Sequence, residues 1–380
     1  MASNSLVIAR EIMVEFAHRT GLLSNKPRRR YLWTDAFAVC NFIELYRQTC
    51  EVEFKNLILG LVDQVHYTLG RHREDDRRDG WISGLSEEDG RKHPTKGGLR
   101  IGKELNERKP LEPFDEILEW ERDGQYYHYL TKWMHALNRV SEITNDQTYN
   151  LWAIELAKTA HAAFVYSTSS GQKRMYWKMS IDLSYPLVHV MGQHDPLDGL
   201  ITYVDLQLKA PKNADWPDLD HEIKDMNGMC EGVDWTTSDP LGIGELLCNS
   251  YKAAQLIPNK YFNTHLIRTL LESSEIGLES YILGDQLELP VDYRLAFREF
   301  GLSIGLKAVG RLKKLAEQKP NLFDEHSKSL IYNLFQHVSL ADKIENHWLE
   351  TEESESWKKH QDINMVMLAT SMIPDGYLKL

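Results

Sequence analysis

Apolar residues recur at helical spacing along nearly the whole chain, and polar residues occupy the opposite face of each predicted helix. Runs that alternate apolar and polar residues, as half-buried strands do, are scarce. The pattern therefore predicts an all-α protein. Helices are expected near residues 5–20, 34–48, 51–69, 126–142, 147–166, 184–192, 197–209, 218–229, 240–256, 263–283, 293–317, 327–348 and 358–372.

From the second helix onward, the predicted helices form pairs. The first member is rich in small and apolar residues, as in "DPLGIGELLCNSYKAAQLI", and the second carries more charge, as in "HLIRTLLESSEIGLESYI". Small residues let helices pack closely around a common axis, whereas charged residues suit an outer layer. We therefore expect inner and outer helices to alternate. The glycines of "LGIGEL", 241–246, fit close helix packing and lack the strand and spacing of a nucleotide loop.

A weak repeat marks the starts of the inner helices. Segments such as "RRYLWTDAFAV", "EGVDWTTSDPLGIG" and "PVDYRLAFREFGL" place an aromatic residue at or just before a helix start, and most add an acid soon afterwards. The pattern resembles the (α/α)6 toroid of the six-hairpin glycosidase-like superfamily. The resemblance implies one domain over residues 1–380, a ring of six hairpins closed by the N- and C-terminal helices, and a charged insert at 70–124.

Members of that superfamily include glycoside hydrolases and sugar 2-epimerases, so the resemblance implies a carbohydrate-active enzyme with a sugar as its ligand. Hydrolysis would use two carboxyl groups, whereas epimerisation next to a carbonyl would use histidines as acid and base. A helical ring that binds ligands without catalysis is an alternative. A helical isoprenoid enzyme is another, because "DDRRD", 75–79, matches an acidic magnesium motif, although no second such motif is present.

The N-terminal ends of the inner helices should share one face, where helix dipoles and long loops favour a binding site. Aromatic rings there can cover the apolar faces of a sugar, and carboxylates can bind its hydroxyl groups. The candidate catalytic residues are Asp35, Asp182, Asp239, His128 and His194. The candidate substrate-binding residues are Trp33, Tyr127, Lys132, Trp177, Trp235 and Arg298.

Each candidate acid also has a purely structural interpretation. Asp239 is a good helix N-cap, and Asp35 suits the first turn of a helix. In "MGQHDPLDG", 191–199, the Asp195-Pro196 pair fits a helix start, and the string should join an inner to an outer helix on the far face from the site. The alternative is an acid–base or metal cluster of His194, Asp195 and Asp198, and the string could reach the cavity if the helix at 184–192 is broken.

The segment 70–110 is so rich in charge and glycine that it is expected to be too polar to form a core. We expect an insert on the site face, either a mobile lid or a solvated loop. Trp81 and Ile82 are its few apolar anchors.

Composition narrows the function further. The formal net charge is -12 and the sequence pI about 5.7, so neither a nucleic acid nor an anionic membrane is an expected partner. No run of apolar residues is long enough to cross a bilayer. Cysteines 40, 50, 230 and 248 are widely spaced and fit a reducing cytoplasm. No cofactor or metal is expected, and the oligomeric state stays open.

Overall fold

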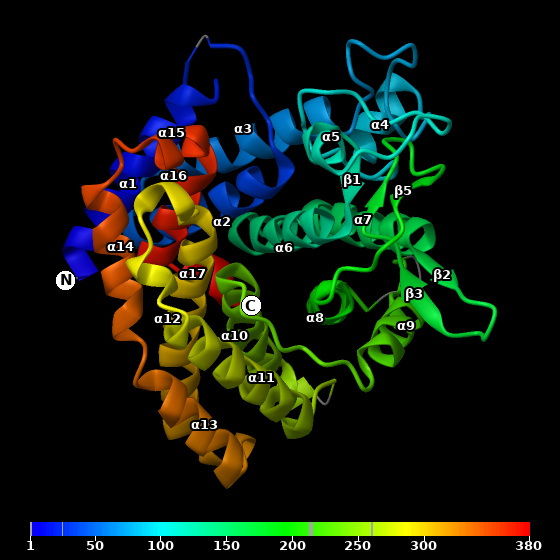
Figure 1. Cartoon of the computed structure of the whole chain (residues 1–380). Helices are drawn as coiled ribbons and strands as arrows, with labels where there is room; N and C mark the ends of the chain where they lie inside the picture. The colour runs from blue at the N-terminus through cyan, green and yellow to red at the C-terminus, as the bar shows by residue number, and fades with distance from the viewer. Residues whose placement is uncertain (1, 25, 213–215, 260) are drawn as a thin grey trace. The chain divides into compact units, whose positions relative to one another are not determined.

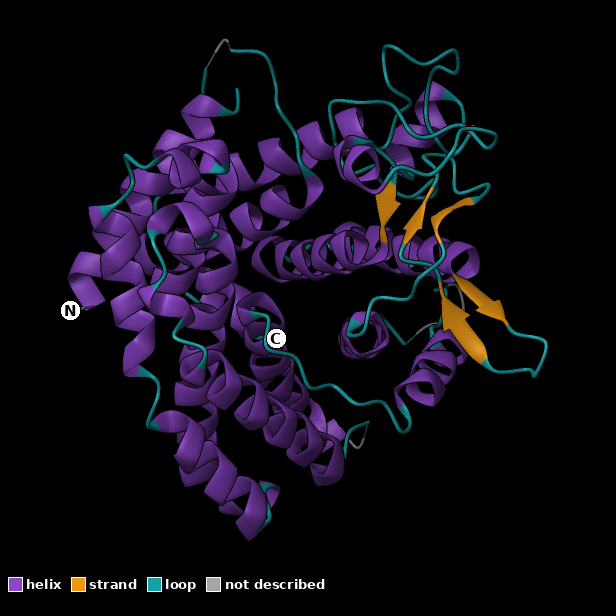
Figure 2. Cartoon of the chain, in the orientation of Figure 1, coloured by secondary structure: helices purple, strands orange, loops and turns teal. Residues whose placement is uncertain are grey.

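The computed structural model describes the chain apart from residues 1, 25, 213–215 and 260, and it is mostly helical (Figures 1 and 2), which confirms the all-α class. The chain divides into two compact units. One contains residues 17–231, and the other contains residues 1–16 together with 232–380. Within the described part of the chain, no helix combines the length and the hydropathy that crossing a bilayer requires.

Three helical hairpins form the frame of the 17–231 unit, with α2, α6 and α8 as inner helices and α3, α7 and α9 as their outer partners. Helix α6 packs against both α2 and α8. The bounds are α2 (Leu32–Thr49), α3 (Val52–Leu69), α6 (Tyr127–Thr144), α7 (Thr148–Phe164), α8 (Asp195–Lys209) and α9 (Asp220–Cys230).

The inner helices of this unit run parallel. At the starts of α2 and α6, the hydroxyl groups of Tyr31 and Tyr129 are 2.7 Å apart, and towards the ends of the same helices Arg47 pairs with Glu142. Helices α6 and α8 also run in the same direction, because Lys132 and then Arg139 of α6 pair with successively later acids of α8. Their N-termini therefore lie on one face of the unit, as predicted.

The 232–380 unit continues the alternation. Inner helices α10, α12 and α16 are accompanied by α11, α13 and α14, and the N-terminal helix α1 belongs largely to this unit. The bounds are α1 (Ala2–Arg19), α10 (Pro240–Leu256), α11 (Thr264–Leu283), α12 (Ala296–Gln318), α13 (Glu325–Phe335), α14 (Ser339–Glu350), α15 (Glu355–Lys359), α16 (Gln361–Met372) and α17 (Asp375–Leu378). Most of α1 is thus grouped with the C-terminal helices, while its pairing with the last inner helix stays a prediction.

The inner helices of the 232–380 unit also run parallel. The backbone N–H of Phe297, in the first turn of α12, donates to the Asn364 side chain of α16, and further along the helices Ser303 lies 2.6 Å from Ser371. Glycines bring α10 and α12 together, because a Cβ on Gly244 would lie 2.0 Å from a backbone oxygen of α12. The close-packing interpretation of "LGIGEL" is therefore confirmed.

Two predicted helices are corrected. The helix expected at 327–348 is two helices, α13 and α14, separated by a turn at 336–338 that no proline or glycine marks. The helix expected at 184–192 is absent. Pro186 begins a short strand there, and valines at 188 and 190 favour the extended backbone. The inner helix of the third hairpin is instead α8, which was predicted as an outer one.

Short strands, which the helical periodicity did not predict, lie in the 17–231 unit (Figure 2). One sheet has the order β1-β4-β5, and β2 pairs with β3, all antiparallel. The bounds are β1 (Gln125–Tyr126), β2 (Val165–Ser167), β3 (Lys173–Met175), β4 (Lys178–Met179) and β5 (Pro186–Val188).

The insert carries two short helices, α4 (Glu87–Lys92) and α5 (Glu116–Glu121). Trp81 is buried as predicted, but Leu99 and Ile101 are fully buried as well, which corrects the expectation that the segment is too polar to form a core. A fully buried carboxylate, Asp123, organises its loops by accepting hydrogen bonds from Arg100 and from backbone N–H groups. A charged segment can pack in this way because its charges are paired.

Candidate functional site

Aromatic side chains gather at the start of α6 in the 17–231 unit. The ring of Trp177 lies 5.1 Å from the rings of both Tyr126 and Trp120. His128 stacks nearly parallel to Trp177, at 6.2 Å and 14°, and meets Tyr129 edge-on at 4.8 Å. These five residues, the aromatic group, come from α5, β1, α6 and the loop before β4.

A pocket of about 550 Å³ opens beside this group. Trp120, Tyr126 and Trp177 line it together with apolar side chains of the 188–191 segment, and the buried Glu119 adds a carboxylate. Lys178 and Arg108 pair with Glu119, each at 2.9 Å. Both the volume and the mixture of apolar walls with a few polar groups are typical of small-molecule sites. We call it the aromatic pocket.

His128 is the histidine of the aromatic group. Its Nδ1 lies 3.8 Å from Oδ1 of Asp195, the first residue of α8, and a quarter of its side chain remains exposed. Burial lowers the pKa of His128, and the positive charge of Lys132 lowers it further, while Asp198 partly offsets both. The imidazole is therefore neutral at neutral pH, the form in which it can accept a proton.

A buried ion pair between α6 and α8 lies next to His128. Lys132, one turn further along α6, places its Nζ 2.6 Å from Asp198, and the hydroxyl group of Thr131 donates to the same carboxylate oxygen. Burying two charges is favourable only when their hydrogen bonds are also satisfied, as they are here. The pair joins the starts of α6 and α8 and so holds His128 and Asp195 close to each other.

The string "MGQHDPLDG" lies on this face and not on the opposite one. His194 is the N-cap residue of α8, and Asp195 and Pro196 begin the helix, as the sequence suggested. Because α8 is an inner helix, however, its start belongs with the starts of α2 and α6. Gly192 makes room for the carboxylate of Asp195, since a Cβ there would lie 2.5 Å from Oδ2.

Trp33 and Asp35 occupy the start of α2. Trp33 is buried, and its ring lies 6.4 Å from that of Tyr129, so it adjoins the aromatic group. The carboxylate of Asp35 is almost inaccessible, accepts the backbone N–H of Tyr31 at 3.0 Å and lies 3.5 Å from the Arg30 guanidinium. These contacts are those of a residue that fixes the helix start.

Asp182 lies in the turn between β4 and β5 and not at a helix start, because the helix predicted there is absent. Arg78 bridges it to Glu107, with a hydrogen bond of 2.8 Å to Asp182. Burial alone would raise the pKa of Asp182, but hydrogen bonds from Ser184 and Ser180 outweigh it and lower the pKa. Burial raises the pKa of Glu107 despite its bonds to Arg78 and to a backbone N–H.

The first two acids of "DDRRD" are also held by arginines. Asp75 accepts hydrogen bonds from Arg73, and Asp76 accepts them from Arg78. The hydrogen bonds from Arg73 lower the pKa of Asp75, and those from Arg78 lower the pKa of Asp76.

Tyr127 belongs to the interior of the 17–231 unit. Its side chain is fully buried, and its hydroxyl group donates to that of Tyr203 at 2.9 Å. Three other candidates lie in the 232–380 unit. Asp239 caps α10 by accepting the Gly242 N–H at 3.0 Å and pairs with Arg298, while Trp235 is buried.

The structure thus brings His128, Lys132 and Trp177 to one place and adds residues that sequence reasoning did not select. Tyr126 and Tyr129 lie within two residues of His128 in the string "YYHYLTKW", 126–133, so their neighbourhood was a usable signal. No sequence signal pointed to Trp120, because nothing in the charged insert that carries this residue placed it beside Trp177. Asp195 was predicted either to start a helix or to join His194 and Asp198 in an acid–base or metal cluster.

No protein-family model matches this sequence, and no curated protein matches it. Three solved structures are similar to it. A sugar epimerase from a ruminal bacterium has 10% identity, with 88% of this chain and 86% of that one covered and a TM-score of 0.48. A polysaccharide lyase has 10% identity, coverages of 73% and 84% and a TM-score of 0.35. Glycosyl hydrolase family 88 from Bacteroides vulgatus has 12% identity, coverages of 71% and 85% and a TM-score of 0.34.

Proposed function

We propose that this chain is a carbohydrate-active enzyme that binds a small sugar in the aromatic pocket, and that it catalyses epimerisation or isomerisation with His128 as the acid–base residue. The observation that carries the proposal is the position of His128, which is stacked on Trp177 beside the pocket and lies 3.8 Å from Asp195. A flat aromatic wall and a neutral imidazole are the two parts that such a reaction needs.

The wall supports a sugar ligand because an aromatic ring covers the C–H face of a pyranose while leaving its hydroxyl groups free. Trp177 is the central ring of the group, and it contacts Tyr126, Trp120 and His128. A sugar on this wall would present a ring carbon to His128 and hydroxyl groups to the polar rim. Glu119 is the carboxylate at that rim.

The proposed proton transfer takes place on the open-chain form of the sugar, because only that form has a free carbonyl group. The neutral imidazole of His128 takes the proton from the carbon next to this carbonyl, and the electron pair of the C–H bond moves into the carbonyl to give an enediolate. Asp195 stabilises the imidazolium that forms. Return of a proton to the opposite face of the carbon gives the epimer. His194, the N-cap residue of α8, is our candidate for that second donor.

Deuterium exchange tests the proposal. A panel of reducing mono- and disaccharides is incubated with the protein in D₂O, and proton NMR follows the signal of the hydrogen next to the carbonyl. We expect exchange with at least one sugar. The substitution His128→Gln should slow this exchange by at least about 100-fold, the usual contribution of a general base.

His189→Gln is the matched control, because His189 is an exposed histidine on the nearby 188–191 segment. It should leave exchange unchanged. Full exchange in His128→Gln, or the absence of any sugar that raises the melting temperature of the wild-type protein, would contradict the proposal.

Glycoside hydrolysis is the second candidate, and one specific observation favours it. Glu107 and Asp182 flank the same guanidinium, and their pKa values are displaced in opposite directions. Such a divergence is what a general acid and its partner carboxylate require. Arg108 links this cluster to the aromatic pocket through its bond to Glu119.

The two reactions leave different products. Hydrolysis releases a reducing end from a glycoside without introducing deuterium at carbon. Hydrolytic activity should be lost in Glu107→Gln and retained in His128→Gln. Epimerase activity should be lost in His128→Gln and retained in Glu107→Gln.

A further inference from the structure

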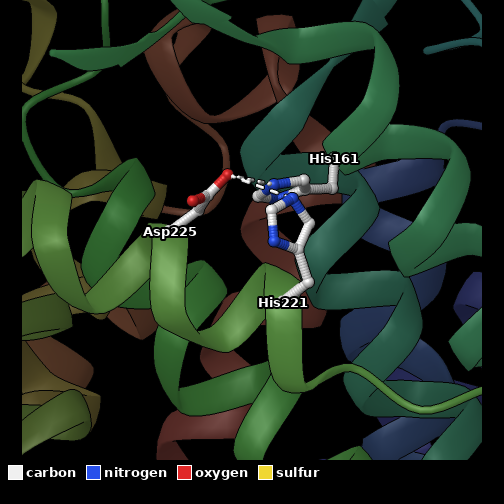
Figure 3. A group of neighbouring side chains, drawn as sticks. All are labelled: His161, His221 and Asp225. Carbon is white, nitrogen blue, oxygen red and sulfur yellow. Dashed lines mark hydrogen bonds and ion pairs between the residues drawn. The ribbon is translucent and has the colours of Figure 1, made fainter. Parts of the chain in front are cut away.

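Two histidines and an aspartate meet on the outer side of the 17–231 unit, away from the contacts described above. His161 comes from α7, and His221 and Asp225 come from successive turns of α9 (Figure 3). Nε2 of His161 lies 3.2 Å from Oδ2 of Asp225, and Nε2 of His221 lies 3.7 Å from the same oxygen. All the potential ligand atoms lie within 4.8 Å of one another.

These separations are close to those of a metal site. Ligand atoms at about 2.0–2.1 Å from a tetrahedral zinc ion lie about 3.3 Å from one another. The two measured separations, 3.2 Å and 3.7 Å, bracket that value. The His221 side chain is 69% exposed and is carried by the same helix as Asp225. Its ring is therefore free to move to a position where all three ligand atoms have the spacing of a metal site.

The arrangement also has the right chemistry. Two imidazole nitrogens and one carboxylate oxygen are a ligand set for zinc, iron and other divalent transition metals, with further positions left for water. Magnesium and calcium prefer oxygen ligands and fit it poorly. Spacing along the chain gave no hint of the set, because His161 lies on a different helix, far from the other two residues in sequence.

Lys173 of β3 is the group that competes with a cation. Its Nζ lies 3.1 Å from Oδ2 of Asp225. The lysine side chain is 37% exposed, so it can turn into solvent when an ion enters. The side chain of His161, on α7, is mostly buried and packs against neighbouring side chains. It is therefore the least mobile of the three proposed ligands.

We propose that His161, His221 and Asp225 bind a divalent transition-metal ion of the zinc type, which fastens α9 to α7. The ion would bridge the second and third hairpins of the 17–231 unit from the outside. Its role is to hold the position of α9, the outer partner of α8, and it takes no part in the chemistry at His128. The proposal does not depend on the function proposed above.

Metal titration of the chelator-treated full-length protein tests this site. We expect Co²⁺ to give the visible absorption bands of a tetrahedral or five-coordinate ion at a stoichiometry of one, and Zn²⁺ to displace it. Zn²⁺ should raise the melting temperature, and Mg²⁺ should have no effect. The substitutions His221→Asn and Asp225→Asn should each weaken binding at least about tenfold, since even outer-sphere changes cost that much.

Two further variants separate this site from adventitious binding by surface histidines. Lys173→Met removes the competing ammonium group and should strengthen Zn²⁺ binding. His189→Gln, an exposed histidine outside the site, should leave it unchanged. His221 is exposed, so His221→Asn should fold normally, as circular dichroism will show. Unchanged affinity in His221→Asn and Asp225→Asn, or no binding by the wild-type and Lys173→Met proteins, would overturn the proposal.

Discussion

At the scale of single residues, two acidic side chains in the first turn of a helix take different roles. Asp35 and Glu53 both lie in the first turn of a helix. Asp35 is buried against Arg30, whereas Glu53 faces solvent. Both satisfy the preference for an acid near a helix N-terminus, so the sequence cannot separate them. Because only Asp35 is buried, only Asp35 is expected to contribute strongly to stability.

Asp35→Asn should lower the free energy of unfolding by about 3 kcal/mol, because it leaves the fully buried Arg30 without its counter-charge. Urea denaturation followed by tryptophan fluorescence measures this change. Glu53→Gln is the matched control and should stay within about 0.5 kcal/mol of the wild-type protein. Wild-type stability combined with lost activity in Asp35→Asn would instead make Asp35 a catalytic residue, as the sequence first suggested.

At the scale of elements, helical periodicity predicted the helices well, but not their breaks or the short strands. The apolar repeat is a property of neighbouring turns and identified α2, α3, α6, α7, α10 and α11 to within a few residues. The strands β4 and β5 depend on pairing with each other, which periodicity does not record. Because these strands replace the predicted helix, Trp177 lies in the loop before β4, Asp182 lies in the turn between β4 and β5, and α8 is the inner helix of the third hairpin.

The contact of α10 with α12 depends on glycine. Gly244→Ala should destabilise the protein by about 1–3 kcal/mol, because the new Cβ would overlap a backbone oxygen of α12. Gly310→Ala, in the interior of α12, is the control. A Cβ at that position meets nothing within 4 Å, and alanine favours the helix, so this variant should be stabilised by about 0.5–1 kcal/mol. Thermal melts of the two variants compare them directly, and equal effects would exclude the close-contact explanation.

At the scale of the whole molecule, buried histidines make stability depend on pH. His66 is buried between tryptophans and accepts a hydrogen bond from Trp133 at 3.1 Å. Burial lowers its pKa from 6.5 to about 3. Below pH 6.5 the unfolded chain takes up a proton at this position and the folded chain does not, so the stability present at neutral pH is progressively lost between pH 6.5 and pH 3.

This histidine alone should reduce the free energy of unfolding by up to about 1.4 kcal/mol for each pH unit below 6.5. Urea midpoints measured from pH 7.5 to pH 5 give the slope. His66→Gln, which keeps an acceptor for Trp133, should show a shallower slope, and the exposed His265→Gln should match the wild-type protein. Parallel slopes in all three proteins would mean that His66 is protonated in the folded state.

The sequence alone predicted the all-α class, the alternation of inner and outer helices outside the third hairpin, and the placement of aromatic residues at the starts of several inner helices. These features follow from spacings of three and four residues, which helix geometry converts directly into faces. The pairing of polar groups from different helices came from the packing of those helices. Lys132 of α6 pairs with Asp198 of α8, and His161 of α7 pairs with Asp225 of α9, in each case more than sixty residues away along the chain. Charge pairing and site formation depend on distances of a few ångströms between elements, and a local pattern carries no record of those distances.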